Sequence, residues 1–204
     1  MKKRGGFDYY GNLRLQGDCA AAAYASYARA LGDCDLFALP ALVERVQTEC
    51  DRCADLRGGV TAALVDDFLP PMDRCDLLTL TIALFGVAEA AEGGLTWLFA
   101  LRSGRLPEAF GTLGATIGQL GASARALSAL PARGKKAMPE LQTNCARIRT
   151  AVRAGRAQCG EALREIYARE ANPRISLLTQ PVEQCFATCA ALANAMELAL
   201  VRNL

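Results

Sequence analysis

The sequence has 204 residues, with 23 Lys and Arg against 21 Asp and Glu, and it contains no histidine. A net charge of +2 gives no global field that would favour nucleic acid, so we expect no nucleic-acid partner. The lack of histidine removes the commonest general base and metal ligand. Because no nucleophile, phosphate-loop or dinucleotide motif is found either, we do not expect an enzyme.

Apolar residues recur at steps of three and four along the chain, and no window alternates with the period of a strand. Breakers that contain Gly or Pro divide the chain into six helices, predicted at about 7–31, 40–68, 73–101, 106–130, 138–168 and 175–204. Asp73 is the expected N-cap of the third helix. Pro181 is expected to kink the sixth helix or delay its start. The sequence therefore predicts an all-α protein.

The two halves of the chain resemble each other. Each consists of a helix, a long second helix, a turn that contains Pro, and an apolar third helix. The segments CADLR at 53–57 and CARIR at 145–149 also echo each other. We therefore predict two tandem three-helix bundles, covering residues 1–102 and 103–204.

The N-terminal residues and one long apolar stretch indicate where in the cell the protein is located. Residues 2–4 are basic, but Gly5-Gly6 follows instead of the apolar run of a signal peptide, and the cysteine count of nine is odd. The stretch 77–100 could cross a membrane by length, yet Glu89 and Glu92 lie in its second half. We expect a cytoplasmic protein with reduced, mostly buried thiols.

Short motifs along the whole chain carry a family resemblance. They are the opening FDYY at 7–10, the segment DRCAD at 51–55, the turn FLPPMDRCD at 68–76 and the ending at 193–204. In order and spacing they resemble the PhoU-like proteins associated with Pit-type inorganic phosphate permeases. The turn is similar to the family's F-x-x-P-x-D-R-x-D.

The resemblance implies a pair of three-helix bundles in which carboxylates on adjacent helices hold metal ions. In the first half, Asp51 and Asp55 match the carboxylate pair of helix two, and of the partner motif only Glu89 keeps an acid. We expect these three residues to hold one divalent or iron-type ion weakly. The alternative, which the abundance of exposed carboxylates favours, is that Asp51 and Asp55 form a solvated helix edge.

In the second half the implied metal site is lost. No Asp or Glu occurs at 141–160, so the acidic motif of helix five is empty in any alignment. The preferred register places the two ligand positions at Val152 and Arg156. On helix six the expected pair reads Glu183 and Ala187. The sequence therefore predicts a degenerate site that does not hold a cation.

Arginines occupy helix five where the family has acids. Arg149, Arg153 and Arg156 are at helical spacing, and a guanidinium fork suits phosphate. One hypothesis is an anion-binding site formed by these three residues. The alternative, favoured by the base rate for charge runs, is a solvated basic face.

Cysteines and glycines offer two further candidates. Cys50 with Cys53, and Cys185 with Cys189, have spacings that allow zinc binding or a redox pair, although all four fall on apolar stripes. Four glycines of helix four are one turn apart, which favours close internal packing over a face that docks on a transporter helix. These glycines are Gly111, Gly114, Gly118 and Gly121.

The predicted function is that of a regulatory accessory of inorganic phosphate transport. The resemblance implies contact with a phosphate permease or a signalling protein at the inner face of the membrane. A metal-binding or redox-sensing helical bundle without a transporter role is the alternative. Self-association into a homo-oligomer is left open.

Overall fold

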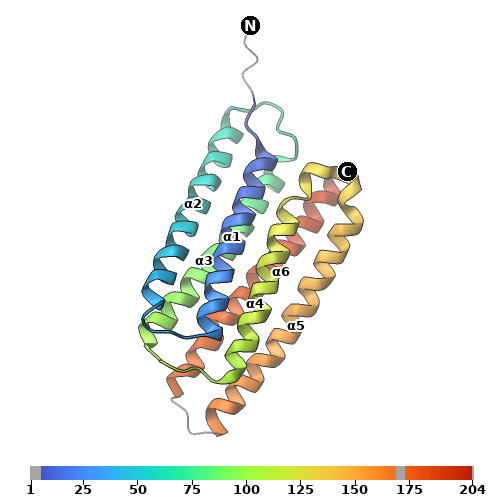
Figure 1. Cartoon of the computed structure of the whole chain (residues 1–204). Helices are drawn as coiled ribbons and strands as arrows, with labels where there is room; N and C mark the ends of the chain where they lie inside the picture. The colour runs from blue at the N-terminus through green and yellow to red at the C-terminus, as the bar shows by residue number, and fades with distance from the viewer. Residues whose placement is uncertain (1–5, 169–172, 204) are drawn as a thin grey trace.

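The computed structural model describes residues 6–168 and 173–203, which form six α-helices (Figure 1). They are α1 Tyr9–Gly32, α2 Leu39–Asp66, α3 Arg74–Leu101, α4 Glu108–Ser128, α5 Met138–Ala168 and α6 Thr179–Arg202. Two 3-10 helices, η1 Pro131–Ala137 and η2 Pro173–Leu178, precede α5 and α6. No strand occurs in these described ranges. The predicted all-α fold with six long helices is confirmed.

Helix ends follow the local chemistry. The Asp73 side chain accepts hydrogen bonds from the backbone N–H groups of Cys75 and Asp76 at 2.8 and 3.3 Å, so it caps α3 as predicted. The sixth helix begins at Thr179, later than predicted, because η2 precedes it. Pro181 then lies in the first turn, where a missing N–H costs no helical hydrogen bond. Part of the break predicted between the fifth and sixth helices, residues 169–172, lies outside the described residues.

Each half of the chain forms a three-helix bundle, and the two bundles lie side by side (Figure 1). The first bundle consists of α1, α2 and α3, and the second of α4, α5 and α6. Helix α1 packs along α4, and α3 packs along α6, whereas α2 and α5 lie at opposite edges of the molecule. The predicted division at residues 1–102 and 103–204, within one compact domain, stays a prediction.

The glycines of α4 allow the close approach between the bundles. A Cβ atom on Gly114 would lie 2.6 Å from the backbone oxygen of Ala28, and one on Gly121 would lie 2.8 Å from the Cβ of Tyr24. Gly118 also faces Ala28 of α1. Because any side chain would push the two helices apart at Gly114 and Gly121, these glycines serve internal packing.

Buried hydrogen bonds fix the helices relative to one another. Tyr24 of α1 is fully buried, and its hydroxyl donates to the backbone oxygen of Cys185 in α6 at 2.9 Å. Within the first bundle, the Thr81 hydroxyl donates to Gln16, whose amide donates to Asn12. Satisfied polar groups of this kind specify how apolar helices align.

Two helical stretches are long and apolar enough to cross a membrane, judged by length and composition. They are Arg74–Leu101 and Pro173–Arg202, and 50% and 44% of their most apolar windows are buried inside the protein. Core helices of a packed bundle pass the same test. This finding is therefore weak evidence for a membrane span.

Candidate functional site

Residues that carry the family resemblance meet at the end of the molecule where both termini lie (Figure 1). The Tyr9 hydroxyl donates to the carboxylate of Asp67 at 2.7 Å. Burial, together with this carboxylate, raises the pKa of Tyr9 to about 12. The guanidinium of Arg74 donates to the backbone oxygens of Leu64 and Asp67, so it satisfies carbonyl groups that the end of α2 leaves free.

The α2–α3 turn is also tied to the C-terminal end of the chain. Asp76 is buried, and its carboxylate accepts hydrogen bonds from Arg202 at 3.3 Å and from the amide of Asn203 at 2.7 Å. Asn203 in turn accepts from the backbone N–H of Asp73 at 2.8 Å. We call Asp73, Asp76, Arg202 and Asn203 the terminal clasp. Its polar groups bond to each other, so this motif stabilises the fold rather than presenting a ligand site.

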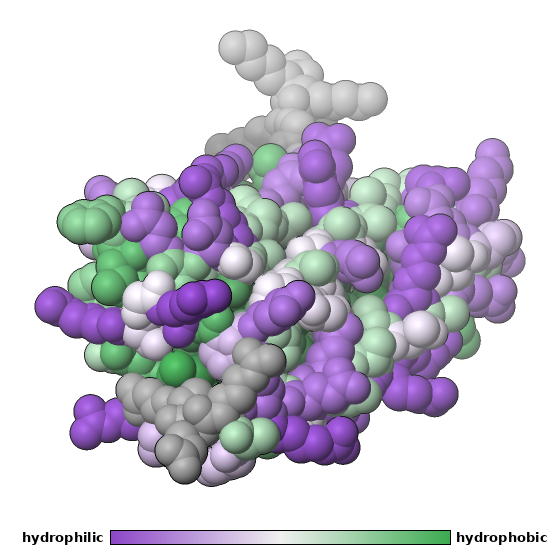
Figure 2. Space-filling view, turned by 60° about the horizontal axis from the view of Figure 1, so that its bottom comes forward, coloured by the Kyte–Doolittle hydropathy of each residue, from purple (hydrophilic) through white to green (hydrophobic). Residues whose placement is uncertain are grey.

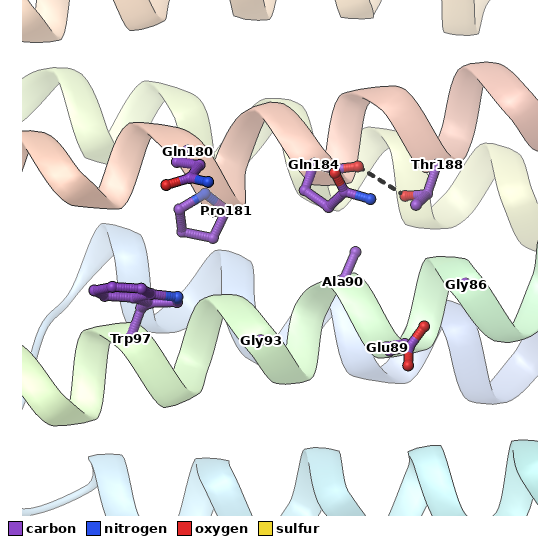
Figure 3. A pocket seen from close by; sticks show the side chains of 9 residues that line it. All are labelled: Gly86, Glu89, Ala90, Gly93, Trp97, Gln180, Pro181, Gln184 and Thr188. Carbon is purple, nitrogen blue, oxygen red and sulfur yellow. Dashed lines mark hydrogen bonds between the residues drawn. The ribbon is translucent and has the colours of Figure 1, made fainter.

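The three residues predicted to hold a metal ion lie on two helices, Asp51 and Asp55 on α2 and Glu89 on α3. Asp51, Asp55 and Glu89 are all exposed. Glu89 lies in a groove of about 490 Å³ between α3 and α6, where Figure 3 shows it across from Gln184 and Thr188. Asp51 and Asp55 belong to α2, which packs against the bundle at α1 and α3. The structure therefore does not bring Glu89 to the aspartate pair.

The acidic residue of α3 that faces α2 is Glu92, which follows Glu89 by one helical turn. Its carboxylate lies beside the Cys50 thiol of α2, and burial together with this carboxylate raises the pKa of Cys50. Within the ranges 6–168 and 173–203, no group of three or more His, Cys, Asp or Glu side chains is placed to hold a metal ion. Metal binding by Asp51, Asp55 and Glu89 stays a prediction without support from this geometry.

Ion pairs join α5 to α6 in the second half, where the family's metal ligands were predicted to be missing. Arg156 lies 3.4 Å from the carboxylate of Glu183, and Arg149 lies 3.1 Å from that of Glu197. Val152, the other expected ligand position, is buried in the core. The α5–α6 boundary therefore joins guanidinium groups to carboxylates and offers no cation site at these positions.

The three predicted arginines share one groove on the surface between α5 and α6. This groove has a volume of about 420 Å³. Its lining consists of Arg149, Val152, Arg153 and Arg156 from α5 and of Ala190 and Asn194 from α6. We call it the arginine groove. The structure thus brings Arg149, Arg153 and Arg156 together, as an anion site requires.

No protein-family model and no curated protein matches the sequence. Solved structures do match its fold. A PhoU-like protein from Shewanella oneidensis MR-1 superposes with a TM-score of 0.71 and 16% sequence identity, over 95% of this chain and 97% of that chain. The chain has a PhoU-like fold. A second protein of that organism, described as a PhoU-like phosphate regulatory protein, gives a TM-score of 0.69 at 14% identity with the same coverage.

The fold likeness confirms the resemblance that the short motifs indicated. Identities of 14% and 16% establish the architecture alone. The association with Pit-type permeases therefore stays a prediction.

The buried thiols of this PhoU-like bundle recur beside glutamates of a neighbouring helix. The four pairs are Cys19 with Glu49, Cys50 with Glu92, Cys145 with Glu197, and Cys159 with Glu183. Burial and the adjacent carboxylate raise the pKa of all four thiols, to about 11 for Cys19 and about 12 for Cys145 and Cys159. Sequence reasoning missed these pairs, since each links two consecutive helices whose relative rotation local patterns do not determine.

Thiol chemistry gains no support from these environments. The thiolate is the form that attacks disulfides and binds zinc, so a raised pKa lowers reactivity. Burial also raises the pKa of Cys53 and Cys189 to about 12, and it raises that of Cys185. The cysteines at the predicted zinc or redox spacings therefore act as small core residues.

Proposed function

We propose that this chain is a regulatory accessory of inorganic phosphate transport that acts by contact with a phosphate permease or a signalling protein. The observation that supports it most is the PhoU-like fold over 95% of the chain. One of the matching proteins is itself described as a PhoU-like phosphate regulatory protein. The proposal contains no catalytic step, and it locates the protein at the cytoplasmic face of the membrane, where such a permease can be reached.

Protein contact is preferred to metal chemistry because of what the surface offers. The predicted metal ligands do not converge in the described residues, whereas large apolar side chains are open to solvent at both ends of the molecule. Phe37, in the α1–α2 turn, is 97% exposed, and Phe68 and Leu69, in the α2–α3 turn, are 89% and 84% exposed. Figure 2 shows hydrophobic residues open among hydrophilic ones on the face that includes the α1–α2 end.

Such exposed apolar side chains commonly mark surfaces that bind other proteins. The metal-binding or redox-sensing alternative has no comparable support, because the thiols of Cys50, Cys53 and Cys185 are buried with raised pKa values. We therefore assign the contact role to the turns at the two ends of the bundle.

Phosphate uptake by cells of the source organism tests the proposal. Deleting the gene should change the rate of uptake, and the wild-type gene should restore it. A Phe68→Ser/Leu69→Ser variant should fold normally but fail to restore uptake, because it removes exposed apolar contacts and buries no new group. Ile82→Ser is the matched control, since Ile82 is 57% exposed on the side of α3 and not in a turn. Unchanged uptake after deletion would contradict the proposal.

A further inference from the structure

The arginine groove contains one cation whose charge is not neutralised by the protein. Arg149 and Arg156 form ion pairs with Glu197 and Glu183. Arg153 lies between them in the sequence and in the groove, and no hydrogen bond or ion pair involves its side chain within the part of the chain that the structure describes. A guanidinium with five donors is therefore available at the centre of the groove.

The two ion pairs determine where that free charge lies. Arg149 and Arg156 are seven residues apart, two helical turns, and Glu183 and Glu197 of the antiparallel α6 are four turns apart. The glutamates therefore hold the two outer arginines toward the ends of the groove. Besides the three arginines, the groove is lined by Val152, Ala190 and Asn194, and none of them carries a negative charge.

We propose that the arginine groove binds a small tetrahedral oxyanion of the phosphate class, with Arg153 as the central ligand. The guanidinium of Arg153 offers the parallel N–H pair that matches two phosphate oxygens. The exposed amide of Asn194 offers a further donor from α6.

The charged side chains of this site are arginines, whereas a metal site of the kind that the resemblance implies is formed by carboxylates. None of the described residues that line the groove is an acid, and the two nearest glutamates bind arginine. Its existence does not depend on the proposed permease contact, because it is a property of the isolated chain. The same phosphate chemistry could come from free inorganic phosphate or from a lipid headgroup, so the experiment includes both.

Isothermal titration with inorganic phosphate, at constant ionic strength adjusted with chloride, tests the site directly. Wild type should bind phosphate, and Arg153→Ala should bind at least about tenfold more weakly, since a hydrogen bond to a charged group is lost. Arg147→Ala is the matched control. It removes the same charge from the same helix, but Arg147 lines a different groove, between α4 and α5.

A second arm uses vesicles that contain phosphatidic acid. Binding to either probe that is lost in Arg153→Ala and kept in Arg147→Ala supports the site and identifies its source of phosphate. Equal binding by wild type and Arg153→Ala overturns the proposal. An equal loss in both variants overturns it too, because the effect would then be general attraction to a basic helix. Absence of binding to both probes by wild type also overturns it.

Discussion

The α2–α3 boundary of the first bundle and the α5–α6 boundary of the second occupy matching places in the two halves, yet their charges differ. Residues 1–102 carry ten Lys and Arg and fourteen Asp and Glu, whereas residues 103–204 carry thirteen and seven. The first half is thus net acidic and the second net basic. The two halves thus share the three-helix architecture but carry net charges of opposite sign.

The difference lies outside the core. Both boundaries pair a buried thiol with a glutamate of the next helix, as Cys50 with Glu92 and Cys145 with Glu197 show. In the second half the glutamate also binds an arginine, Arg149. In the first half Glu92 forms no ion pair with any residue that the structure describes. Buried thiols beside glutamates are therefore common to both halves, and arginines that pair with these glutamates occur in the second half.

Alkaline pH should cause the largest loss of stability. The seven buried thiols have pKa values above the ordinary value of 9, and the unfolded chain would ionise near that value. Their contribution is therefore complete below pH 9 and is lost as pH rises toward the folded-state values, such as about 12 for Cys53. Each thiol loses about 1.4 kcal/mol per pH unit in that window.

For seven thiols this loss near pH 10 is comparable with the whole free energy of unfolding of an ordinary domain. Urea unfolding measured from neutral to alkaline pH checks it. Cys75→Ser, at an exposed position, should leave the profile unchanged. A free energy that stays flat up to pH 10 would refute the thiol account.

The contact between the two bundles, formed by α1 and α4, can be disrupted by a substitution in α4. Gly114→Val places a side chain against the backbone oxygen of Ala28 and should lower the free energy of unfolding by about 3 kcal/mol, as overpacking does. Gly111→Ala is the control, because a Cβ there meets nothing within 4 Å. Chemical denaturation compares the two variants. A Gly114→Val protein as stable as Gly111→Ala would show that the helices are not in close contact.

The terminal clasp links the first half to the end of the second. Asp76→Ala removes the acceptor of Arg202 and Asn203, so it should cost about 2 kcal/mol in the free energy of unfolding. Asp55→Ala, an exposed acid of the same half, should cost less than about 0.5 kcal/mol. If thermal unfolding shows equal losses for the two, the clasp does not stabilise the fold.

Divalent ions should produce the smallest effect. Because Asp51, Asp55 and Glu89 do not converge, adding Mn²⁺ should raise the melting temperature of wild type no more than that of an Asp51→Asn/Asp55→Asn variant. Differential scanning fluorimetry with and without the ion measures this. If Mn²⁺ raises the melting temperature of wild type but not of the variant, the predicted metal site exists. The two halves would then differ in metal binding as well as in charge.

Sequence periodicity was sufficient to predict the helices, because inward stripes at steps of three and four are local properties of the chain. The N-cap at Asp73 follows from the same local chemistry. The sequence did not predict which carboxylate of α3 faces the neighbouring helix α2. Glu89 and Glu92 are one turn apart, so a rotation of α3 by about 60° decides which of them faces α2.

The arginine groove shows the same limit. The spacing of Arg149, Arg153 and Arg156 predicts that they share a helix face. Only the position of α6 decides that Glu197 and Glu183 bind the outer two and leave Arg153 free. Pairings between two helices depend on how the helices pack against each other, which local sequence patterns do not encode.

We propose that this chain, which has a PhoU-like fold, acts by protein contact and without a metal cluster. Affinity capture of the tagged chain from membranes of its own source organism, with and without prior chelator treatment, tests it most directly, with the captured proteins quantified by mass spectrometry. The account predicts that a phosphate permease or its signalling protein is enriched equally in both samples. Enrichment that disappears after chelation, or that includes no such protein, would contradict it.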